Sequence, residues 1–248
     1  MKISIITACY NSAATIADTL KSVAIQDYNY IEHILIDGAS TDNTLEIIKS
    51  FPHVSYVVSG NDKGIYDAMN KGIAMASGDV VGILNSDDVY TNNRVVSTVM
   101  REFENHRVDA VYADLQYVKY NDLEKATRTW HSGTFSKRKF YFGWMPPHPT
   151  FFVRRAVYEE IGNFNCSLLS AADYEFMLRV MLKNDYKANY IPEVLVKMRA
   201  GGMSNATIGN RLRANREDRE AWRINNITPY FFTIPFKPLR KVLQFIFK

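Results

Sequence analysis

The sequence predicts an α/β domain in which a mostly parallel sheet is flanked by helices. Short apolar runs typical of buried strands alternate, from the first residues onward, with segments whose apolar residues recur at helical spacing. A parallel strand needs a crossover connection, usually a helix, so this alternation indicates a parallel sheet covered by helices. The 248 residues suffice for one such domain with a full core and a C-terminal appendage.

The first βαβ unit shows both periodicities. A buried strand at residues 3–9 is followed by a helix, capped at Ser12 or Thr15, and then by a strand at residues 31–37. The elements expected next are a helix at 42–50, a strand at 54–58, a helix at 65–76, a strand at 80–84, a strand at 109–119, an irregular aromatic segment at 130–149 and a helix at 171–183.

The composition excludes several classes of protein. With 47% hydrophobic and 13% aromatic residues the chain is not disordered, and no apolar run approaches the roughly 18 residues of a transmembrane helix. The first residues lack the basic and apolar segments of a secretory signal, so we expect a cytoplasmic protein. The two cysteines, Cys9 and Cys166, lack the spacing of a zinc site and are expected to be reduced thiols.

Two adjacent carboxylates follow the strand expected at residues 80–84, in the motif Asn85-Ser86-Asp87-Asp88. Adjacent acids repel each other, and a hard divalent cation such as Mg²⁺ or Mn²⁺, which takes carboxylates together with substrate phosphates, gives a reason for the pairing. The alternative is a solvated turn or a helix cap, because aspartate is favoured in both.

Other acids are expected near the same edge of the sheet. Asp37 ends the second strand and could accept hydrogen bonds from a base or a ribose, and Asp62 lies in a further loop. Both could equally be turn residues. Asp173 begins a helix, where it could act as a general base or simply interact with the helix dipole. Arg179, on that helix, could reach a phosphate or a structural carboxylate.

His148 lies between two prolines that stiffen its loop. Its imidazole is the one group of this loop that titrates near neutrality, so it could contact an acceptor or a diphosphate. A lone histidine is also a common structural hydrogen-bonding group.

Five motifs occur in a fixed order along the chain. They are Ser4-Ile5-Ile6-Thr7-Ala8-Cys9-Tyr10-Asn11, then Ile36-Asp37-Gly38-Ala39-Ser40-Thr41-Asp42, then Asp62-Lys63-Gly64-Ile65-Tyr66-Asp67-Ala68-Met69-Asn70-Lys71-Gly72, then Asn85-Ser86-Asp87-Asp88, and finally Ala172-Asp173-Tyr174-Glu175 with Leu178-Arg179. Together they resemble family 2 glycosyltransferases with the GT-A fold, of the type that makes bacterial surface polysaccharides such as O-antigen, capsule and exopolysaccharide.

The resemblance implies roles for individual residues. The donor nucleotide would contact Thr7, Tyr10, Asn11, Asp37, Asp62, Asn85, Ser86 and Asp87. Asp87 and Asp88 would hold Mn²⁺ or Mg²⁺ under the diphosphate, and Asp173 would be the catalytic base. Trp144, His148 and Arg179 are candidate contacts to the acceptor or diphosphate. Two positions depart from the family pattern, because Ala172 replaces a glutamate and Asn85 stands where an aspartate often begins the metal motif.

The implied reaction is an inverting transfer from a nucleoside diphosphate sugar, UDP being the expected nucleotide, to a hydroxyl of a saccharide acceptor carried on polyprenyl diphosphate. No nucleic acid partner is expected, and the oligomeric state stays open. The domain division that follows is a catalytic domain at 1–205, with a nucleotide-sugar-binding half at 1–107 and an acceptor-side half at 108–205, and a helical tail at 206–248.

The tail is basic and aromatic. Leu239, Val242, Leu243, Ile246 and Phe247 fall on one stripe of a helix, opposite basic residues, after the aromatic run at 230–232. A basic amphipathic helix suits the surface of an anionic bilayer, so we expect a peripheral protein on the inner face of the cell membrane. The alternative is a helix docked on the catalytic domain or on a partner.

Two other functions use similar residues. A sugar-nucleotide nucleotidyltransferase should carry a Gly-rich basic loop after its first strand, and Tyr10-Asn11-Ser12-Ala13-Ala14 has neither property. A non-catalytic carbohydrate-binding or scaffold protein on the same fold stays open because of Ala172.

Overall fold

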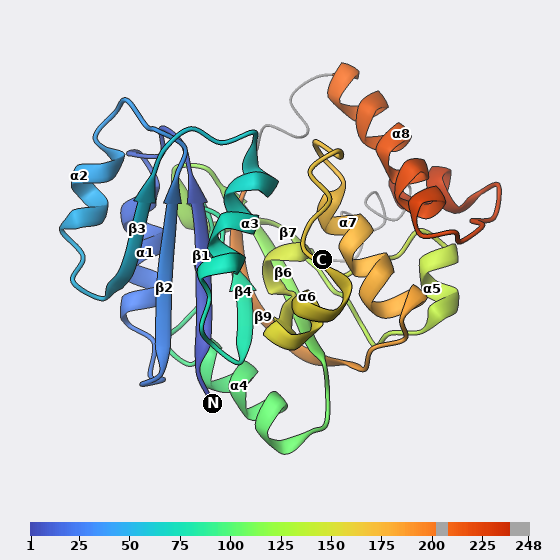
Figure 1. Cartoon of the computed structure of the whole chain (residues 1–248), viewed down its shortest axis with the longest axis horizontal. Helices are drawn as coiled ribbons and strands as arrows, with labels where there is room; N and C mark the ends of the chain where they lie inside the picture. The colour runs from blue at the N-terminus through green and yellow to red at the C-terminus, as the bar shows by residue number, and fades with distance from the viewer. Residues whose placement is uncertain (202–207, 239–248) are drawn as a thin grey trace.

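Four parallel strands form the N-terminal half of a nine-stranded sheet in the computed structural model, which describes residues 1–201 and 208–238 (Figure 1). They are β1 (Ile3–Cys9), β2 (Ile31–Asp37), β3 (Val54–Ser59) and β4 (Val80–Ile83), in the order β3-β2-β1-β4. The register pairs Cys9 with Asp37, so β1 and β2 end at the same level of the sheet.

Helices cover both faces of this half of the sheet, as the helical periodicity predicts. They are α1 (Ile16–Ala24), α2 (Thr44–Lys49), α3 (Ile65–Met75) and α4 (Val95–Asn105). Strand β2 shows how the two faces are used: Ile34 and Ile36 pack in one core cluster with α3, whereas Leu35 packs in another with α1 and α2. Alternate residues of a strand point to opposite faces, so the apolar run Ile34–Ile36 of β2 reflects the burial of both faces of the strand.

The C-terminal half of the sheet is mixed. Strand β8 (Phe152–Arg154) lies antiparallel between β4 and β6 (Ala110–Lys119), and β9 (Ala188–Arg199) runs parallel to β6. Strand β7 (Asp122–Trp130) forms a hairpin with β6, and the short β5 (Val89–Tyr90) pairs with β9. The predicted α/β fold and the strand near residues 109–119 are confirmed. Strands β5, β7, β8 and β9 and helix α4 were not among the expected elements.

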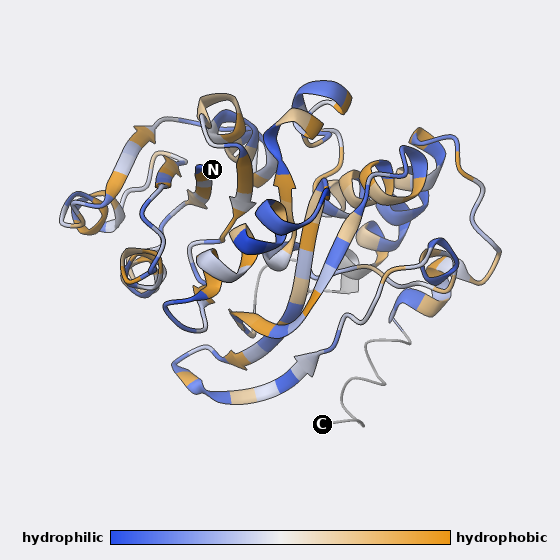
Figure 2. Ribbon diagram, turned by 90° about the horizontal axis from the view of Figure 1, so that it is seen from below, coloured by the Kyte–Doolittle hydropathy of each residue, from blue (hydrophilic) through white to orange (hydrophobic). Residues whose placement is uncertain are grey.

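The remaining helices lie around this half. They are α5 (Lys137–Tyr141), the short η1 (His148–Thr150), α6 (Arg155–Ile161), α7 (Ala172–Met177), the π-helical η2 (Leu178–Lys183) that continues α7, and α8 (Ile208–Ile224). The helix expected at 171–183 is therefore present, with a π-helical second half. Figure 2 shows hydrophobic residues running along the central strands and hydrophilic residues on the outer parts of the helices and loops.

The described part of the C-terminal tail packs on the domain. Trp222 of α8 is fully buried, and its indole N–H donates to the hydroxyl of Tyr174 at 2.9 Å. Ile234 belongs to the same core cluster, and the ammonium of Lys237 donates to Asp218 at 2.6 Å. Residues 208–238 thus share the core of the rest of the molecule. The amphipathic stripe expected at 239–247 lies outside the described residues.

Two observations bear on the composition-based expectations. Cys9 and Cys166 are both free thiols. Within residues 1–201 and 208–238, no helix combines the length and the apolar character needed to cross a bilayer.

Two histidines are in contact beside β1, the fully buried His33 and the partly exposed His53. Nδ1 of His33 is 3.1 Å from Nε2 of His53, and its Nε2 is 3.1 Å from the hydroxyl oxygen of Thr7. Burial, and then the neighbouring His53, lower the pKa of His33 from 6.5 to about 3. The folded protein therefore keeps His33 neutral at pH values at which the unfolded chain is protonated.

Acidification is expected to destabilise the fold through His33. Between pH 6.5 and about 3 the unfolded chain binds a proton that the folded state rejects, so this group's contribution to stability is lost as the pH falls through that window. Through His33 the free energy of unfolding is expected to change by at most about 1.4 kcal/mol per pH unit. Urea unfolding at several pH values should show a weaker acid dependence for His33→Gln than for the matched exposed variant His106→Gln. Equal acid dependence in the two variants would exclude this role of His33.

Candidate active site

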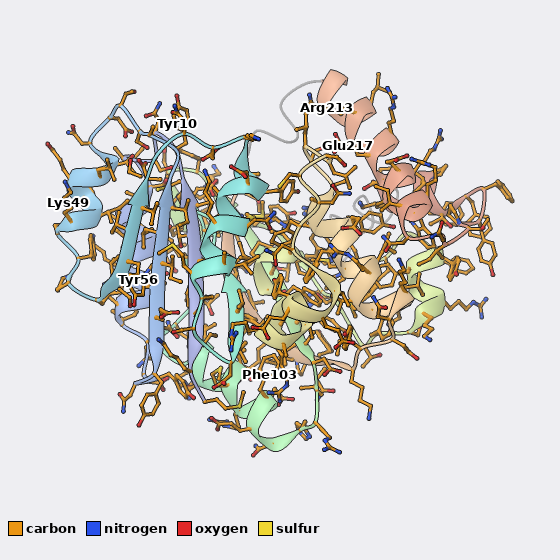
Figure 3. All side chains as sticks on the ribbon, in the orientation of Figure 1. Tyr10, Lys49, Tyr56, Phe103, Arg213 and Glu217 are labelled. Carbon is orange, nitrogen blue, oxygen red and sulfur yellow. The ribbon has the colours of Figure 1, made fainter. Side chains whose placement is uncertain are left out.

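The carboxyl ends of the parallel strands converge at one edge of the sheet. Arrowheads of β1, β2 and β3 point to the upper edge in Figure 1, and Tyr10, the residue after β1, lies at that edge in Figure 3. Ligands of open α/β sheets bind at such an edge, because loops and helix N-termini meet there. The loops after β1, β2 and β4 lie here.

The β1 and β2 loops are bonded to each other. Asn11 has a left-handed backbone (φ 48°), its side-chain oxygen accepts from the N–H of Thr41 at 2.9 Å, and its own N–H donates to the hydroxyl of Ser40 at 2.8 Å. Asparagine tolerates this backbone region better than most residues do. Asn11 thus fixes the loop that presents Tyr10.

Asp37 is a buried hydrogen-bond acceptor at the same edge of the sheet. Its carboxylate is fully buried and accepts from the hydroxyl of Ser59 at 2.6 Å and from the N–H of Ser40 at 3.1 Å. Thr7 is also fully buried, with its hydroxyl bonded to His33. The prediction that Thr7 contacts the nucleotide is wrong for its side chain, because β1 is buried on both faces and Thr7 points into the interior.

Tyr10 and Asp62 flank Gly38. A Cβ atom at Gly38 would lie 2.7 Å from Oδ2 of Asp62 and 3.5 Å from the ring of Tyr10, so a larger residue would displace the Asp62 carboxylate. The Tyr10 side chain is 62% exposed, and the other oxygen of Asp62 accepts from the N–H of Gly64 at 2.9 Å. An open aromatic face therefore lies next to a carboxylate, as a nucleoside site requires: the ring can stack on a base and the carboxylate can accept from hydroxyl groups.

The β4 loop contains a hydrogen-bonded chain. The side-chain amide of Asn85 donates to Oδ2 of Asp88 at 3.0 Å and to Nε2 of His148 at 3.1 Å. Asp88 is fully buried, and its Oδ1 has no hydrogen-bond partner among the described residues. The hydroxyl oxygens of Ser86 and Ser12 are 2.9 Å apart, which joins this loop to the β1 loop.

The surroundings of the two carboxylates of this loop disfavour their charged forms. Burial raises the pKa of Asp87, and burial together with the charge of Asp87 raises the pKa of Asp88 well above its ordinary value. The guanidinium of Arg199, which donates to the main-chain oxygen of Asp87 at 2.7 Å, opposes both shifts only in part. A bound cation would relieve the repulsion.

The donor set fits a hard divalent ion. In residues 1–201 and 208–238 no cluster of three histidine, cysteine, aspartate or glutamate side chains could hold a metal by itself. Mg²⁺ and Mn²⁺ need no such cluster, because one or two carboxylates together with substrate phosphates and water complete their coordination. Asp87, which is partly exposed, and the unpartnered oxygen of Asp88 are the oxygen donors at hand.

His148 links Asp173 to the loop that follows β4. It lies in the first turn of α7, where Oδ1 accepts from the hydroxyl of Tyr66 at 3.0 Å and Oδ2 lies 3.4 Å from Nδ1 of His148. Since the amide of Asn85 donates to Nε2, that nitrogen must accept, and the network assigns the ring proton to Nδ1, which faces Asp173. The predicted base and the predicted metal loop are thus joined by one imidazole.

Two candidate contacts are wrong. All three guanidinium nitrogens of Arg179 donate within the protein, to the carboxylate of Glu175 and to the main-chain oxygens of residues 161, 162 and 163, so no N–H remains for a phosphate. The side chain of Trp144 is 3% exposed, packs on Tyr112 and Phe140, and donates to a main-chain oxygen at 2.8 Å. Both residues are structural.

Three residues of the site were missed from the sequence. Tyr66 fitted the apolar pattern of α3, and nothing in the pattern marked its hydroxyl. Arg199 lies 112 residues from Asp87, with no local motif. Glu217 of α8 accepts from both the N–H and the hydroxyl of Ser170, at 2.7 and 2.8 Å, and so holds the segment before Asp173. Figure 3 shows Glu217 on the side of α8 near this upper edge.

Comparison with known proteins finds related glycosyltransferases. The model of the family "Glycosyl transferase family 2" matches residues 4–162. A PGL/p-HBAD biosynthesis glycosyltransferase of Mycobacterium tuberculosis is 29% identical over 211 residues, which are 83% of this chain and 80% of that protein. An uncharacterized glycosyltransferase of the same species, Rv1514c, is 34% identical over 183 residues, 73% of this chain and 69% of that protein.

Solved structures share the fold. Residues 1–349 of Staphylococcus aureus TarS, in complex with UDP-GlcNAc, superpose with a TM-score of 0.72 at 22% identity over 91% of this chain. This chain spans 65% of that fragment. The mannosyltransferase PcManGT from Pyrobaculum calidifontis, in complex with GDP-Man and Mn²⁺, superposes with a TM-score of 0.67 at 20% identity over 99% of this chain and 69% of that one.

Proposed function

Because this chain belongs to glycosyltransferase family 2, whose model matches residues 4–162, we propose that it is an inverting, metal-dependent glycosyltransferase. It transfers a sugar from a nucleoside diphosphate donor, UDP being the expected nucleotide, to a hydroxyl of a saccharide acceptor. The observation that carries the proposal is the meeting of the Asp87 loop with Asp173 through His148.

The donor nucleoside is proposed to bind between Tyr10 and Asp62 over Gly38. Stacking on the exposed ring holds the base, and the carboxylate accepts from the ribose or base. TarS binds UDP-GlcNAc and PcManGT binds GDP-Man on the same fold, which supports a nucleotide sugar as the donor class. Asn11, Ser86 and buried Asp37 position these loops rather than fill the site.

Asp87 and Asp88 are proposed to hold the divalent ion, and the presence of Mn²⁺ in the PcManGT complex supports this choice of metal. When bound, the ion supplies charge neutralisation for the departing diphosphate. The guanidinium of Arg199 donates to the main-chain oxygen of Asp87, and the hydroxyl of Thr19 donates to the main-chain oxygen of Asp88 at 2.8 Å. Two side chains from other elements therefore hold the main chain of this loop in place.

Asp173 is proposed to take the proton of the acceptor hydroxyl as that oxygen attacks the anomeric carbon. Its carboxylate is held on one oxygen by Tyr66 and on the other by His148, so it is oriented before substrate binds. Ala172, which replaces the family's glutamate, is fully buried and contributes no polar group. The two side chains that hold Asp173 come instead from α3 and from the His148 loop.

The acceptor is proposed to be a saccharide on polyprenyl diphosphate in bacterial polysaccharide synthesis. The mycobacterial relative named above is a glycosyltransferase of PGL/p-HBAD biosynthesis, which supports a biosynthetic role for this chain. We further propose that residues 1–107 carry the donor site, that residues 108–205 form the acceptor side, and that the protein works on the inner face of the cell membrane.

A panel of nucleotide sugars tests this function. Each donor is incubated with the full chain, with and without Mn²⁺ or Mg²⁺, and release of nucleoside diphosphate and thermal stabilisation are measured. We expect one donor to be stabilising and slowly hydrolysed only when the metal is present. Binding without turnover, even with added saccharide acceptors, would favour a carbohydrate-binding protein. Turnover unaffected by chelation would contradict the metal.

A further inference from the structure

Aromatic side chains form an exposed surface near the C-terminus. We call this surface, made of Phe142, Tyr230, Phe231, Phe232 and Phe236, the aromatic shelf. Phe231 is 94% exposed, Tyr230 is 51% exposed and Phe236 is 38% exposed. Their rings contact one another through Phe232, at centroid distances of 4.9 to 5.3 Å. Contiguous exposed aromatic surface of this kind is uncommon unless it binds something.

The segment that carries the aromatic shelf packs on the rest of the domain. Ile234 is buried in the main core, and the hydroxyl of Thr233 donates to the main-chain oxygen of Tyr141 at 2.7 Å. Gly143 brings the chain after α5 so close that a Cβ atom there would lie 2.5 Å from the main-chain nitrogen of Lys237. The exposed rings are therefore presented by a docked segment, which reduces the ordering needed when they bind.

Positive charge borders the shelf. Lys137 and Arg138 of α5 are exposed. The ammonium of Lys137 is paired with the exposed Asp185 at 2.9 Å, and the guanidinium of Arg138 lies over the ring of Phe142, 5.3 Å from its centroid. The neighbouring Asp218 is buried and already paired with Lys237. The sequence directly after the shelf adds Arg240 and Lys241. The combination is aromatic side chains next to basic ones.

We propose that the aromatic shelf docks on the surface of an anionic lipid bilayer. Aromatic rings favour the interfacial region of a membrane, and basic side chains beside them are attracted to anionic headgroups. A second copy of this chain is a poorer partner, because a twofold contact buries the same patch of each copy and would bring two basic surfaces close together. The docking does not depend on the proposed transfer reaction.

Vesicle binding tests the proposal with the full chain. Co-sedimentation is measured with phosphatidylcholine vesicles that contain phosphatidylglycerol and with vesicles that lack it. Phe231→Ala is expected to weaken binding to anionic vesicles by about tenfold, and Arg138→Glu by about fivefold or more. Tyr56→Ala and Lys49→Glu are the matched controls, since both residues are exposed and lie at the opposite end of the molecule (Figure 3).

Each outcome decides the proposal. Reduced binding of both shelf variants with unchanged controls supports it, provided that binding requires the anionic lipid. Shelf variants that bind as the unmodified chain does would overturn it, and so would an unmodified chain that does not bind. A shelf variant that changes the oligomeric state in light scattering and leaves vesicle binding unchanged would mark a protein interface instead. Nucleotide-sugar turnover in solution reports separately on the active site.

Discussion

Asp173→Asn is expected to lower turnover by roughly 100- to 10,000-fold while donor binding persists. A positioned general base contributes a rate factor of this order, and asparagine keeps the shape of the side chain but cannot accept the proton. The donor site at Tyr10, Gly38 and Asp62 does not involve Asp173, so the donor's thermal stabilisation should change little. Donor-dependent melting and initial rates at saturating donor separate the two effects.

The matched control is Asp27→Asn, because Asp27 is exposed and is none of the residues assigned to the site. It should leave both rate and donor binding unchanged. If Asp173→Asn worked nearly as fast as this control, Asp173 would not be the base, whatever the metal dependence.

Substitution of the two residues that contact Asp173 tests its role as the base with smaller expected effects on turnover. Tyr66→Phe and His148→Gln each remove or alter one of the two contacts to its carboxylate. Losing one such contact is expected to cost about tenfold in turnover, with little change in the KM for the donor. A shifted pH profile of turnover in His148→Gln would show that the imidazole tunes the base, whereas a purely structural loss would leave the profile in place.

Asp87→Asn is expected to reduce turnover by roughly 100- to 1,000-fold and to weaken the metal-dependent part of donor binding. Asp87 is the partly exposed carboxylate of the loop, and metal assistance to a leaving diphosphate is worth several kcal/mol. Titration of Mn²⁺ against donor-induced stabilisation measures the loss directly. Asp122→Asn, in the exposed β6–β7 turn, is the matched control.

Asp88→Asn distinguishes the two acids. Asp88 is fully buried and anchors Asn85, so the substitution is expected to disturb the Asn85–His148 contacts as well as to weaken manganese binding. Manganese affinity that is unchanged in Asp88→Asn would remove Asp88 from the metal site. Unchanged manganese dependence in Asp87→Asn would remove Asp87 from the metal site.

The sequence by itself determined the first half of the fold and the main acids of the site. Apolar runs and helical spacing located β1 to β4, α1 and α3, because those patterns arise from burial within each element. Asp87, Asp88 and Asp173 stood out because their residue types and positions at element ends suit metal binding and proton transfer. Their roles in metal binding and proton transfer stay predictions that the substitutions above test.

Tertiary structure alone decided which side chains face the site. Thr7 and Tyr10 are three residues apart, yet Thr7 is buried against His33 and Tyr10 is 62% exposed. The sequence does not predict this difference, because β1 has no polar face that would show which side chains point outward. Arg179 and Arg199 are both arginines with no distinguishing local pattern, and only the fold pairs one with Glu175 and places the other under Asp87. The spacing of apolar residues along a segment indicates which of its residues are buried. Which side chain each buried residue contacts depends instead on segments far apart in the chain, and this spacing does not describe them.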